Sequence, residues 1–251
     1  MAAERFLVVN ADDFGQSPGV NRGVISAHQR GIVTSASLMV RWPAAAEAAS
    51  FGQTQPDLSL GLHFDLGEWA YREPDWVPVY DVVPTDDAVA VADELQRQLA
   101  KFRQLVGRNP THIDSHQHVH LDEPVRSLLI QAARELAVPV RHFTPAVRYS
   151  GAFYGQTRTG TPFPSAISVE ALMRVLATLP PGATELGCHP GEGDDLHGMY
   201  RAERAQEVAA LCDPQIRAAL VAKNVELCSF SDVTARLATP RGESEGQGIP
   251  K

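Results

Sequence analysis

The chain has 251 residues, of which 44% are hydrophobic and 21% charged, as in an ordinary soluble globular protein with a sizeable core. Its formal net charge of −8 disfavours surfaces that bind nucleic acid or anionic membranes, because both need basic patches. Three cysteines without CxxC spacing, no signal-peptide core and no apolar run near the ~18 residues of a membrane span indicate a cytoplasmic protein without an integral membrane segment.

The first predicted unit is a short buried strand over residues 6–10 followed by a helix. Ser17 suits the helix N-cap and Pro18 the first helical position. Asp12 and Asp13 stand at the carboxyl end of the strand, where most such pairs are only polar turn residues. Alone, this pair does not decide between a turn and a functional site.

The next two strands are expected over residues 32–40 and 58–62. The second of them delivers His63 at its end, followed by Asp65 and Glu68. A histidine there is often a hydrogen-bonded core residue. However, this is the second buried strand with a potential metal ligand at its carboxyl end, after the strand that precedes Asp12 and Asp13, and the repetition favours a functional site.

Residues 67–84 are rich in aromatics and prolines and show no clean helical or strand period, so a loop is expected. Its aromatics either stack on sugar rings or fix the loop to the core. A long amphipathic helix follows over residues 86–106 and ends at Gly107, with an apolar stripe that belongs to the core.

The densest group of chemistry-bearing residues follows Pro110, where potential ligands occupy every second position. If this stretch were a strand, the potential ligands would share one face of it. The run would span roughly 26 Å, however, so the ligands cannot all meet at one ion. A strand over residues 111–115 is more typical in length and leaves His116 at its carboxyl end. The alternating residues are His112, Asp114, His116, His118 and His120.

The remaining elements repeat the pattern of strand and helix. After a helix over residues 123–137, a strand is expected over 139–142. The segment 143–167 is unusually long for a loop, as is typical of a lid or a subunit contact, so a homodimer stays open. A strand over 184–188 delivers His189, and a last strand is expected over 225–229.

Seven strands that alternate with helices predict an α/β fold, and we favour a (β/α) barrel over an open doubly wound sheet. Residues 1–238 are expected to form one domain, followed by a flexible polar tail over 239–251, because no linker divides the chain. In such a barrel Asp12, Asp13, His63, His116 and His189 would converge on one rim although they are far apart in sequence.

Five motifs together carry a resemblance to the YdjC-like carbohydrate deacetylases, which include chitooligosaccharide deacetylases. The resemblance implies a distorted TIM-like barrel with about seven parallel strands, one divalent metal ion, Mg²⁺ or Zn²⁺, and hydrolysis of the acetyl group on an N-acetylated sugar. It also implies Asp13, His63 and His116 as metal ligands and Asp12 as the base. The motifs begin at Asn10 (NADDFG), Gly31 (GIVTS), Gly61 (GLH), Thr111 (THIDSHQHVH) and Cys188 (CHPG).

Amide hydrolysis needs an activated water, an electrophile for the carbonyl oxygen and an acid for the amine. His189 is the candidate acid. Asp114 is expected to orient a ligand histidine, whereas His118 and His120 would bind substrate or hydrogen-bond their loop. Asp65 departs from the family pattern and either meets a polar substrate group or meets nothing.

Two other functions fit part of the sequence. A metal-dependent phosphoesterase would use a similar rim but usually needs a second metal and basic residues, of which Arg141 and His142 form the only obvious pair near a strand end. The second alternative function is a barrel that binds sugar without catalysis, although the complete set of metal ligands together with a base disfavours it.

Overall fold

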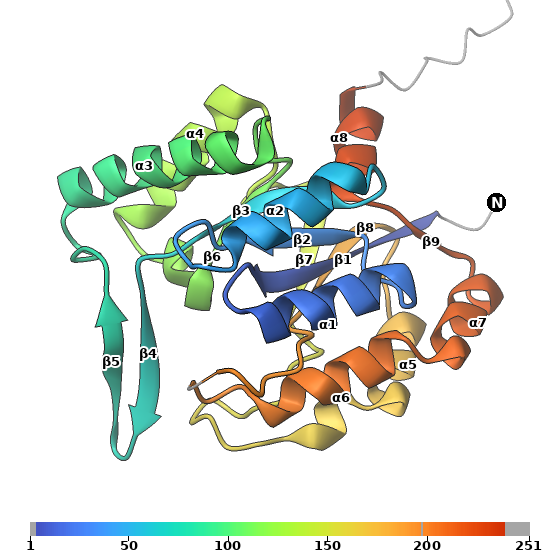
Figure 1. Ribbon diagram of the computed structural model, residues 1–251. Coiled ribbons are helices and arrows are strands. Elements are labelled where there is room, and N and C mark those ends of the chain that lie inside the picture. Colours follow the sequence, from blue (N-terminus) through green and yellow to red (C-terminus); the bar gives the residue numbers. More distant parts are fainter. Residues whose placement is uncertain (1–3, 197, 239–251) are drawn as a thin grey trace, which may run out of the picture.

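The computed structural model describes residues 4–196 and 198–238, and its centre is one parallel sheet (Figure 1). Its seven strands run in the order β6-β3-β2-β1-β8-β7, with β9 paired to β1. The predicted barrel-like α/β fold is confirmed, and it is distorted because β6 and β7 end this order without pairing to each other. The strands are β1 (Arg5–Phe14), β2 (Ser35–Leu38), β3 (Ser59–Phe64), β6 (Ile113–Ser115), β7 (Val147–Ser150), β8 (Gly182–Cys188) and β9 (Val225–Leu227).

The central strand β1 is longer than the apolar run in the sequence, because it continues through both aspartates to Phe14. Its register on β2 shifts between Ala11 and Phe14, where Asp13 has a left-handed φ of 64°. Aspartate adopts this region more readily than most residues. The irregularity lies at the carboxyl end of the strand, where Asp12 and Asp13 both line a cavity.

Helices lie above and below the strands in the view of Figure 1. The helix after β1 begins as predicted, with the Ser17 side chain accepting a hydrogen bond from the Val20 backbone N–H and Pro18 in the first turn. Helix α3 ends at Gly107, which is left-handed (φ 79°), and packs against α2 and α4. The helices are α1 (Pro18–Gln29), α2 (Ala45–Thr54), α3 (Ala88–Val106), α4 (Val125–Leu136), α5 (Val169–Ala177), α6 (Ala202–Leu211), α7 (Pro214–Ala222) and α8 (Phe230–Ala238).

The prediction of a loop over residues 67–84 is wrong, because most of this segment forms an antiparallel hairpin of β4 (Gly67–Arg72) and β5 (Asp75–Asp81). The hairpin extends away from the sheet (Figure 1). Most of β5 is solvent-exposed, so the alternation of buried and exposed residues that marks a half-buried strand is weak there.

The strand predicted over residues 139–142 is reduced to a single bridge between Ile113 and Val140. Strand β7 lies instead inside the segment 143–167, which was predicted to be a long loop, and pairs with β8. The rest of that segment contains a short 3₁₀ helix, η2 (Pro164–Ile167). Among the described helices, none combines the length and the apolar character that crossing a bilayer requires.

Candidate functional site

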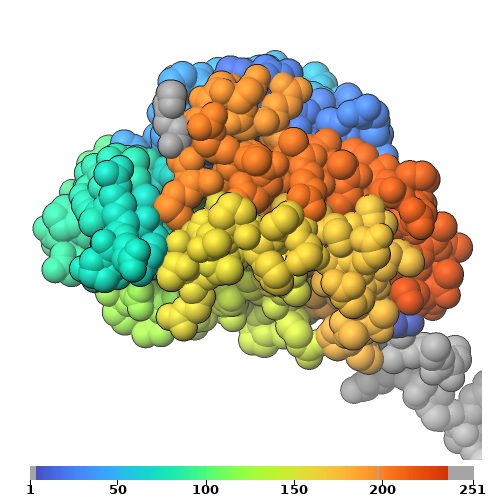
Figure 2. All heavy atoms as spheres, turned by 90° about the horizontal axis from the view of Figure 1, so that it is seen from below, coloured from blue at the N-terminus to red at the C-terminus, as the bar shows by residue number. Residues whose placement is uncertain are grey.

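A cavity of about 780 Å³ lies at the carboxyl ends of the strands. Asp12, Asp13, His63, His116 and His189, which the sequence analysis expected on one rim, all line it. The hairpin β4–β5, residues 151–160 and the described residues of 189–196 and 198–204 form its outer walls. Figure 2 shows the hairpin in teal beside the yellow and orange segments.

Asp13, His63 and His116 form a buried triad of potential metal ligands, one from each of three segments. Oδ1 of Asp13 lies 3.3 Å from Nε2 of His63 and 3.1 Å from Nδ1 of His116. Ligand atoms held about 2.1 Å from one ion are roughly 3.0 to 3.4 Å apart in octahedral or tetrahedral geometry. The triad therefore has the donor types and spacing of a divalent metal site. Nε2 of His116 is also buried without a hydrogen-bond partner among the described residues.

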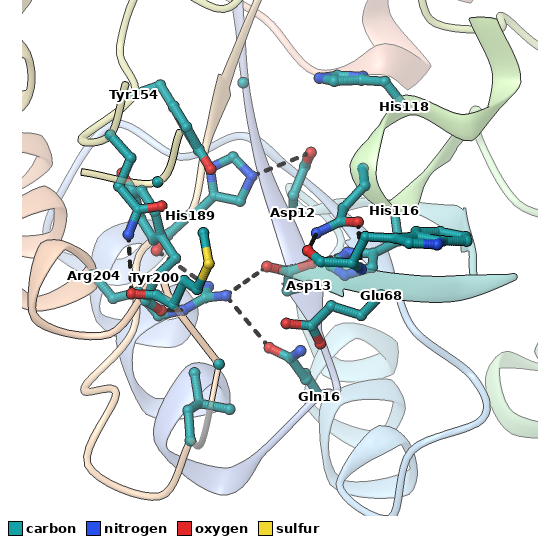
Figure 3. A pocket seen from close by; sticks show the side chains of 18 of the residues that line it. Asp12, Asp13, Gln16, Glu68, His116, His118, Tyr154, His189, Tyr200 and Arg204 are labelled. Atoms are coloured by element: carbon teal, nitrogen blue, oxygen red, sulfur yellow. Dashed lines mark hydrogen bonds and ion pairs between the residues drawn. The ribbon is translucent and has the colours of Figure 1, made fainter. Parts of the chain in front are cut away.

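The remaining atoms of the triad are fixed by charged neighbours. Asp114 contacts Nδ1 of His63 at 2.7 Å, which orients the ring and leaves Nε2 directed at Asp13. Arg204 donates a 2.7 Å hydrogen bond to Oδ2 of Asp13, so only Oδ1 faces the two histidines (Figure 3). Burial opposes ionisation of Asp13, but Arg204 and the two histidines hold the pKa of this carboxyl well below its usual value.

Burial lowers the pKa of His63, but the carboxylates of Asp114 and Asp13 outweigh it and raise the pKa to about 10. The pKa of His116 is raised as well, since its hydrogen bond to Asp13 more than offsets the burial. Three acidic and imidazole side chains thus form a pocket that favours a positive charge. A proton or a metal ion supplies such a charge, and the two compete for the same nitrogen atoms.

Asp12 points into the cavity beside the triad, and Arg141 holds both of its oxygens at 2.7 Å. The same guanidinium contacts Asp114 at 2.8 Å and Glu185 at 2.7 Å. Burial alone would raise the pKa of Asp12, yet Arg141 lowers it, so the carboxylate is ionised at neutral pH. Burial raises the pKa of Glu185 to about 7 despite the same arginine.

His189 lies across the cavity from Asp12, with 3.8 Å between its Nε2 and Oδ2 of Asp12 (Figure 3). Burial lowers the pKa of this imidazole to about 4, so the ring is neutral at pH 7. Its backbone N–H donates to Glu207 at 2.5 Å, and Tyr200 donates to the same carboxyl group. Glu207, on α6, therefore positions the loop that carries the histidine.

The close packing of α1 positions this loop from the other side. A Cβ atom on Gly23 would lie 2.2 Å from Cα of Gly191, so any larger residue would push the helix and the loop apart. Tyr154 stacks on Tyr200 with ring centroids 4.8 Å apart, and both rings lie against His189.

The other residues singled out in the sequence are placed differently. His118 lines the cavity, whereas His120 is fully buried and contacts Ser115. Asp65 is fully buried, and its carboxylate accepts hydrogen bonds from Arg41, Trp42, Tyr80 and the backbone of Gly67. Asp65 thus anchors the hairpin. His112 stacks on Phe230 in the core.

Sequence reasoning missed the residues that hold the site together. Arg204 and Glu207 lie on α6, and only their spacing of three, which puts both on one face, could have drawn attention to them. Arg141 was considered as a phosphate ligand rather than as the partner of carboxylates. Nothing in the sequence indicated that Glu185 is buried, since a single acidic residue inside an apolar strand has no distinct pattern.

Solved structures support the fold. A protein from Enterococcus faecalis V583 matches with a TM-score of 0.73 at 23% sequence identity, and the match covers 92% of this chain and 99% of the other. A family 4 carbohydrate esterase from Streptomyces lividans, in complex with acetate, matches with a TM-score of 0.53 at 16% identity over 91% and 93% of the two chains. At these identities the likeness establishes the fold alone.

Sequence relatives are closer. A chitooligosaccharide deacetylase from Serratia marcescens is 32% identical, with 92% of this chain and all of the relative covered. A carbohydrate deacetylase from Geobacillus stearothermophilus is 34% identical over 91% of this chain and 98% of the relative. The family model described as YdjC-like protein matches residues 6–222. The chain therefore belongs to the YdjC-like protein family.

Proposed function

We propose that the protein is a metal-dependent carbohydrate deacetylase that hydrolyses the N-acetyl group of an N-acetylglucosamine-containing sugar and releases acetate. One observation carries this proposal: Asp13, His63 and His116 lie together in a cavity that also presents Asp12 and His189. The names of the sequence relatives agree with it, since they are chitooligosaccharide and carbohydrate deacetylases.

Asp13, His63 and His116 would hold one divalent ion, either Mg²⁺ or Zn²⁺. A bound ion would polarise the acetyl carbonyl and make a water molecule more acidic. The alternative grouping of Asp12, His63 and Asp114 is a weaker candidate, because both of its carboxylates are ion-paired with Arg141.

Asp12 accepts the proton of the attacking water. Its low pKa keeps it ionised, and Arg141 fixes the direction of the carboxylate, which is worth more to catalysis than a free but mobile base. The low pKa also makes it a weak base, and the greater acidity that a bound ion would give the water would offset this weakness.

His189 protonates the departing amine. Because this ring is neutral at pH 7, it must receive a proton during the reaction, and the carboxyl group of Asp12 lies 3.8 Å from its Nε2. The proton taken from water by Asp12 therefore passes through His189 to the amine nitrogen as the C–N bond breaks. Such a relay leaves both side chains in their starting states after one turnover.

The substrate class follows from the walls of the cavity. Trp69, Trp76 and Tyr80 project from the hairpin and Tyr154 from the opposite wall, and aromatic faces of this kind stack on sugar rings. A volume of about 780 Å³ is large enough for more than one sugar ring. An N-acetylglucosamine oligomer or conjugate fits this description.

The phosphoesterase is disfavoured because the two buried arginines of the site, Arg141 and Arg204, already have partners. Arg141 is surrounded by three carboxylates and Arg204 is paired with Asp13, so neither offers a free positive charge to phosphate. A barrel that only binds sugar would not need Asp12 and His189 beside a triad of potential metal ligands.

Acetate release from diacetylchitobiose, measured with metal-loaded and chelated protein, tests the proposal. Asp12→Asn and His116→Ala should each lower kcat/KM at least about 100-fold, since each removes a group used in the chemistry. Asp57→Asn, an exposed aspartate, is the matched control. If metal-loaded protein releases no acetate from any N-acetylglucosamine substrate, the proposal is wrong, and phosphate release from sugar phosphates is the next assay.

A further inference from the structure

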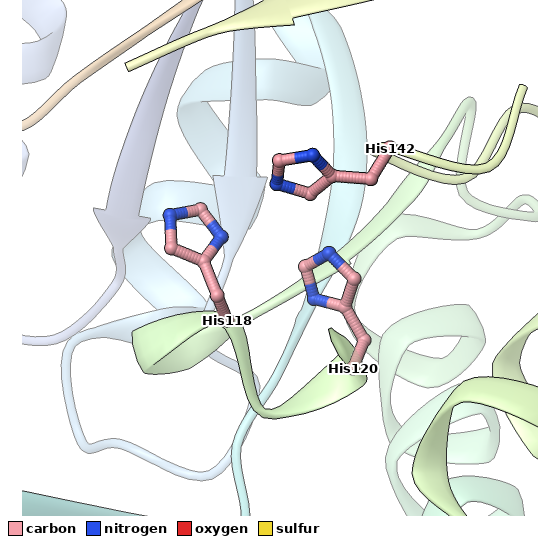
Figure 4. A group of neighbouring side chains, drawn as sticks. All are labelled: His118, His120 and His142. Atoms are coloured by element: carbon pink, nitrogen blue, oxygen red, sulfur yellow. The ribbon is translucent and has the colours of Figure 1, made fainter. Parts of the chain in front are cut away.

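A second group of potential metal ligands lies near the cavity and consists only of histidines: His118, His120 and His142 (Figure 4). One nitrogen of each ring lies within 4.8 Å of the others, and the ring centroids are 5.4 to 5.6 Å apart. The first two histidines belong to η1 (His116–Leu121), and the third follows Arg141. This histidine cluster shares no residue with the Asp13 triad.

Two ring nitrogens in the histidine cluster are buried without a hydrogen-bond partner in the described part of the chain: Nδ1 of His118 and Nε2 of His120. His120 is fully buried, and its other nitrogen lies 2.6 Å from Oγ of Ser115. When Nδ1–H donates to Ser115, Nε2 presents a lone pair, which is how an outer partner normally orients a metal-binding histidine. A buried lone pair without a partner is costly, and a metal ion would satisfy it.

The surroundings of the histidine cluster favour metal ions over protons. Burial lowers the pKa of His120 to about 3, and it also lowers the pKa of His142. Both rings are therefore neutral at pH 7, the form that binds metals. The nearby charge of Arg141 does not exclude a cation, because Asp12, Asp114 and Glu185 surround that guanidinium.

We propose that His118, His120 and His142 form a second metal site that takes Zn²⁺. Three imidazoles without an oxygen ligand suit zinc and not Mg²⁺, and a fourth position stays open for water. Ligand atoms around zinc are roughly 3.4 Å apart, so the rings must approach one another on binding. His142 is the most exposed of the three and lies on a loop, which allows its ring to move closer to the other two. His118 and Tyr149 line the cavity, so the site borders the substrate pocket.

Metal content of the tag-free protein tests this proposal without reference to activity. Protein stripped with a chelator is titrated with Zn²⁺, and with Co²⁺, whose visible spectrum reports tetrahedral imidazole ligands. The wild type should bind two equivalents of Zn²⁺. His142→Ala and His116→Ala should each bind one equivalent, and the variant that combines both substitutions should bind none. His28→Ala is the matched control, because His28 lies on α1 and bonds to the carbonyl of Val33. It should keep two equivalents.

The two proposed sites fail separately in this experiment. A wild type that binds one equivalent, lost in His116→Ala and kept in His142→Ala, overturns the second site and leaves the first intact. Two equivalents that persist in both His142→Ala and His120→Ala also overturn it, since the second ion then lies elsewhere. An unchanged Co²⁺ spectrum in His142→Ala overturns it as well. Loss of the ion in His142→Ala alone supports the second site whatever the enzyme's activity.

Discussion

Arg141 is the residue on which the buried charges of the site depend. It is almost completely buried, and Asp12, Asp114 and Glu185 all lie within 2.8 Å of its guanidinium. The carboxylates hold the pKa of this arginine well above its usual value although burial opposes its charge. Two of these carboxylates contact side chains to which we assign roles, namely His189 as the proposed acid and His63 as a proposed metal ligand, so one cation fixes the geometry of both.

Arg141→Met should destabilise the protein severely, because it removes the guanidinium from Asp12 and Glu185 and leaves Asp114 with only His63 as an ion-pair partner among the described residues. Removing one partner of a buried ion pair typically costs about 3 to 5 kcal/mol. Urea unfolding, followed by circular dichroism, measures the loss. The control is Arg22→Ala, whose exposed pair with Glu192 should contribute little to stability because solvent screens it. Equal losses in the two variants would contradict this account of the network.

Glu185→Gln should change how stability depends on pH. Burial raises the pKa of Glu185 from 4.5 to about 7, so between these values the folded protein keeps a proton that the unfolded chain has released. The free energy of unfolding therefore falls as pH rises through this window, by up to about 1.4 kcal/mol per unit from this one group. Glutamine can still accept the hydrogen bond from Arg141 but does not titrate.

Urea unfolding at pH 4.5, 5.5, 6.5 and 7.5 tests this effect. The stability of Glu185→Gln relative to the wild type should rise steadily from the first pH to the third and then level off. The exposed Glu135→Gln should show no such trend. A constant difference between Glu185→Gln and wild type would mean that the buried carboxyl ionises normally.

At the residue level, the sequence indicates the side chains that stand where strands end and does not indicate their partners. Asp13, His63 and His116 lie at the carboxyl ends of buried strands, and parallel topology brings such positions together. Arg141 and Arg204 reach the site from segments whose final distance from it depends on packing. Their contacts join positions 129 and 191 residues apart, which no local pattern encodes.

At the level of elements, helices with strong caps were predicted well, and irregular strands were not. Helix α3 has an N-cap at Asp87 and a left-handed Gly107, and both signals are local. Strand β7, in contrast, has a mixed burial pattern and exists because β8 offers it hydrogen bonds. The hairpin β4–β5 was missed for a similar reason, since its strands pair mainly with each other and bury little.

The hairpin places Trp76 on the wall of the cavity although this side chain remains 49% exposed. Trp76→Ala should raise KM for diacetylchitobiose about two- to tenfold with little change in kcat, because stacking on a ring contributes about 0.5 to 1.5 kcal/mol. Steady-state acetate release measures both constants. Phe163→Ala is the control, since this aromatic is 50% exposed and does not line the cavity. Unchanged KM in Trp76→Ala would place the sugar elsewhere.

At the level of the whole molecule, the parallel sheet joins distant parts of the chain. Strand β1 pairs with β8 along one edge and, along the other edge, with β9 near its beginning and with β2 near its end, so the first strand touches the last. The candidate site combines residues from Asp12 to Arg204 in the same way. An apolar cluster continues from β1 through α6 and α7 without a break. These contacts predict that the described residues unfold as one cooperative unit.

Leu211→Ala tests this cooperativity. Leu211 is fully buried at the end of α6, so its truncation should cost about 2 to 5 kcal/mol. All three tryptophans lie between residues 42 and 76, more than a hundred residues away in sequence. If the molecule is one unit, tryptophan fluorescence and far-ultraviolet circular dichroism should report the same lowered urea midpoint. Val221→Ala, at a position 83% exposed, should leave both midpoints unchanged. A tryptophan midpoint that stays at the wild-type value while the dichroism signal becomes biphasic would show instead that the carboxyl-terminal helices unfold independently.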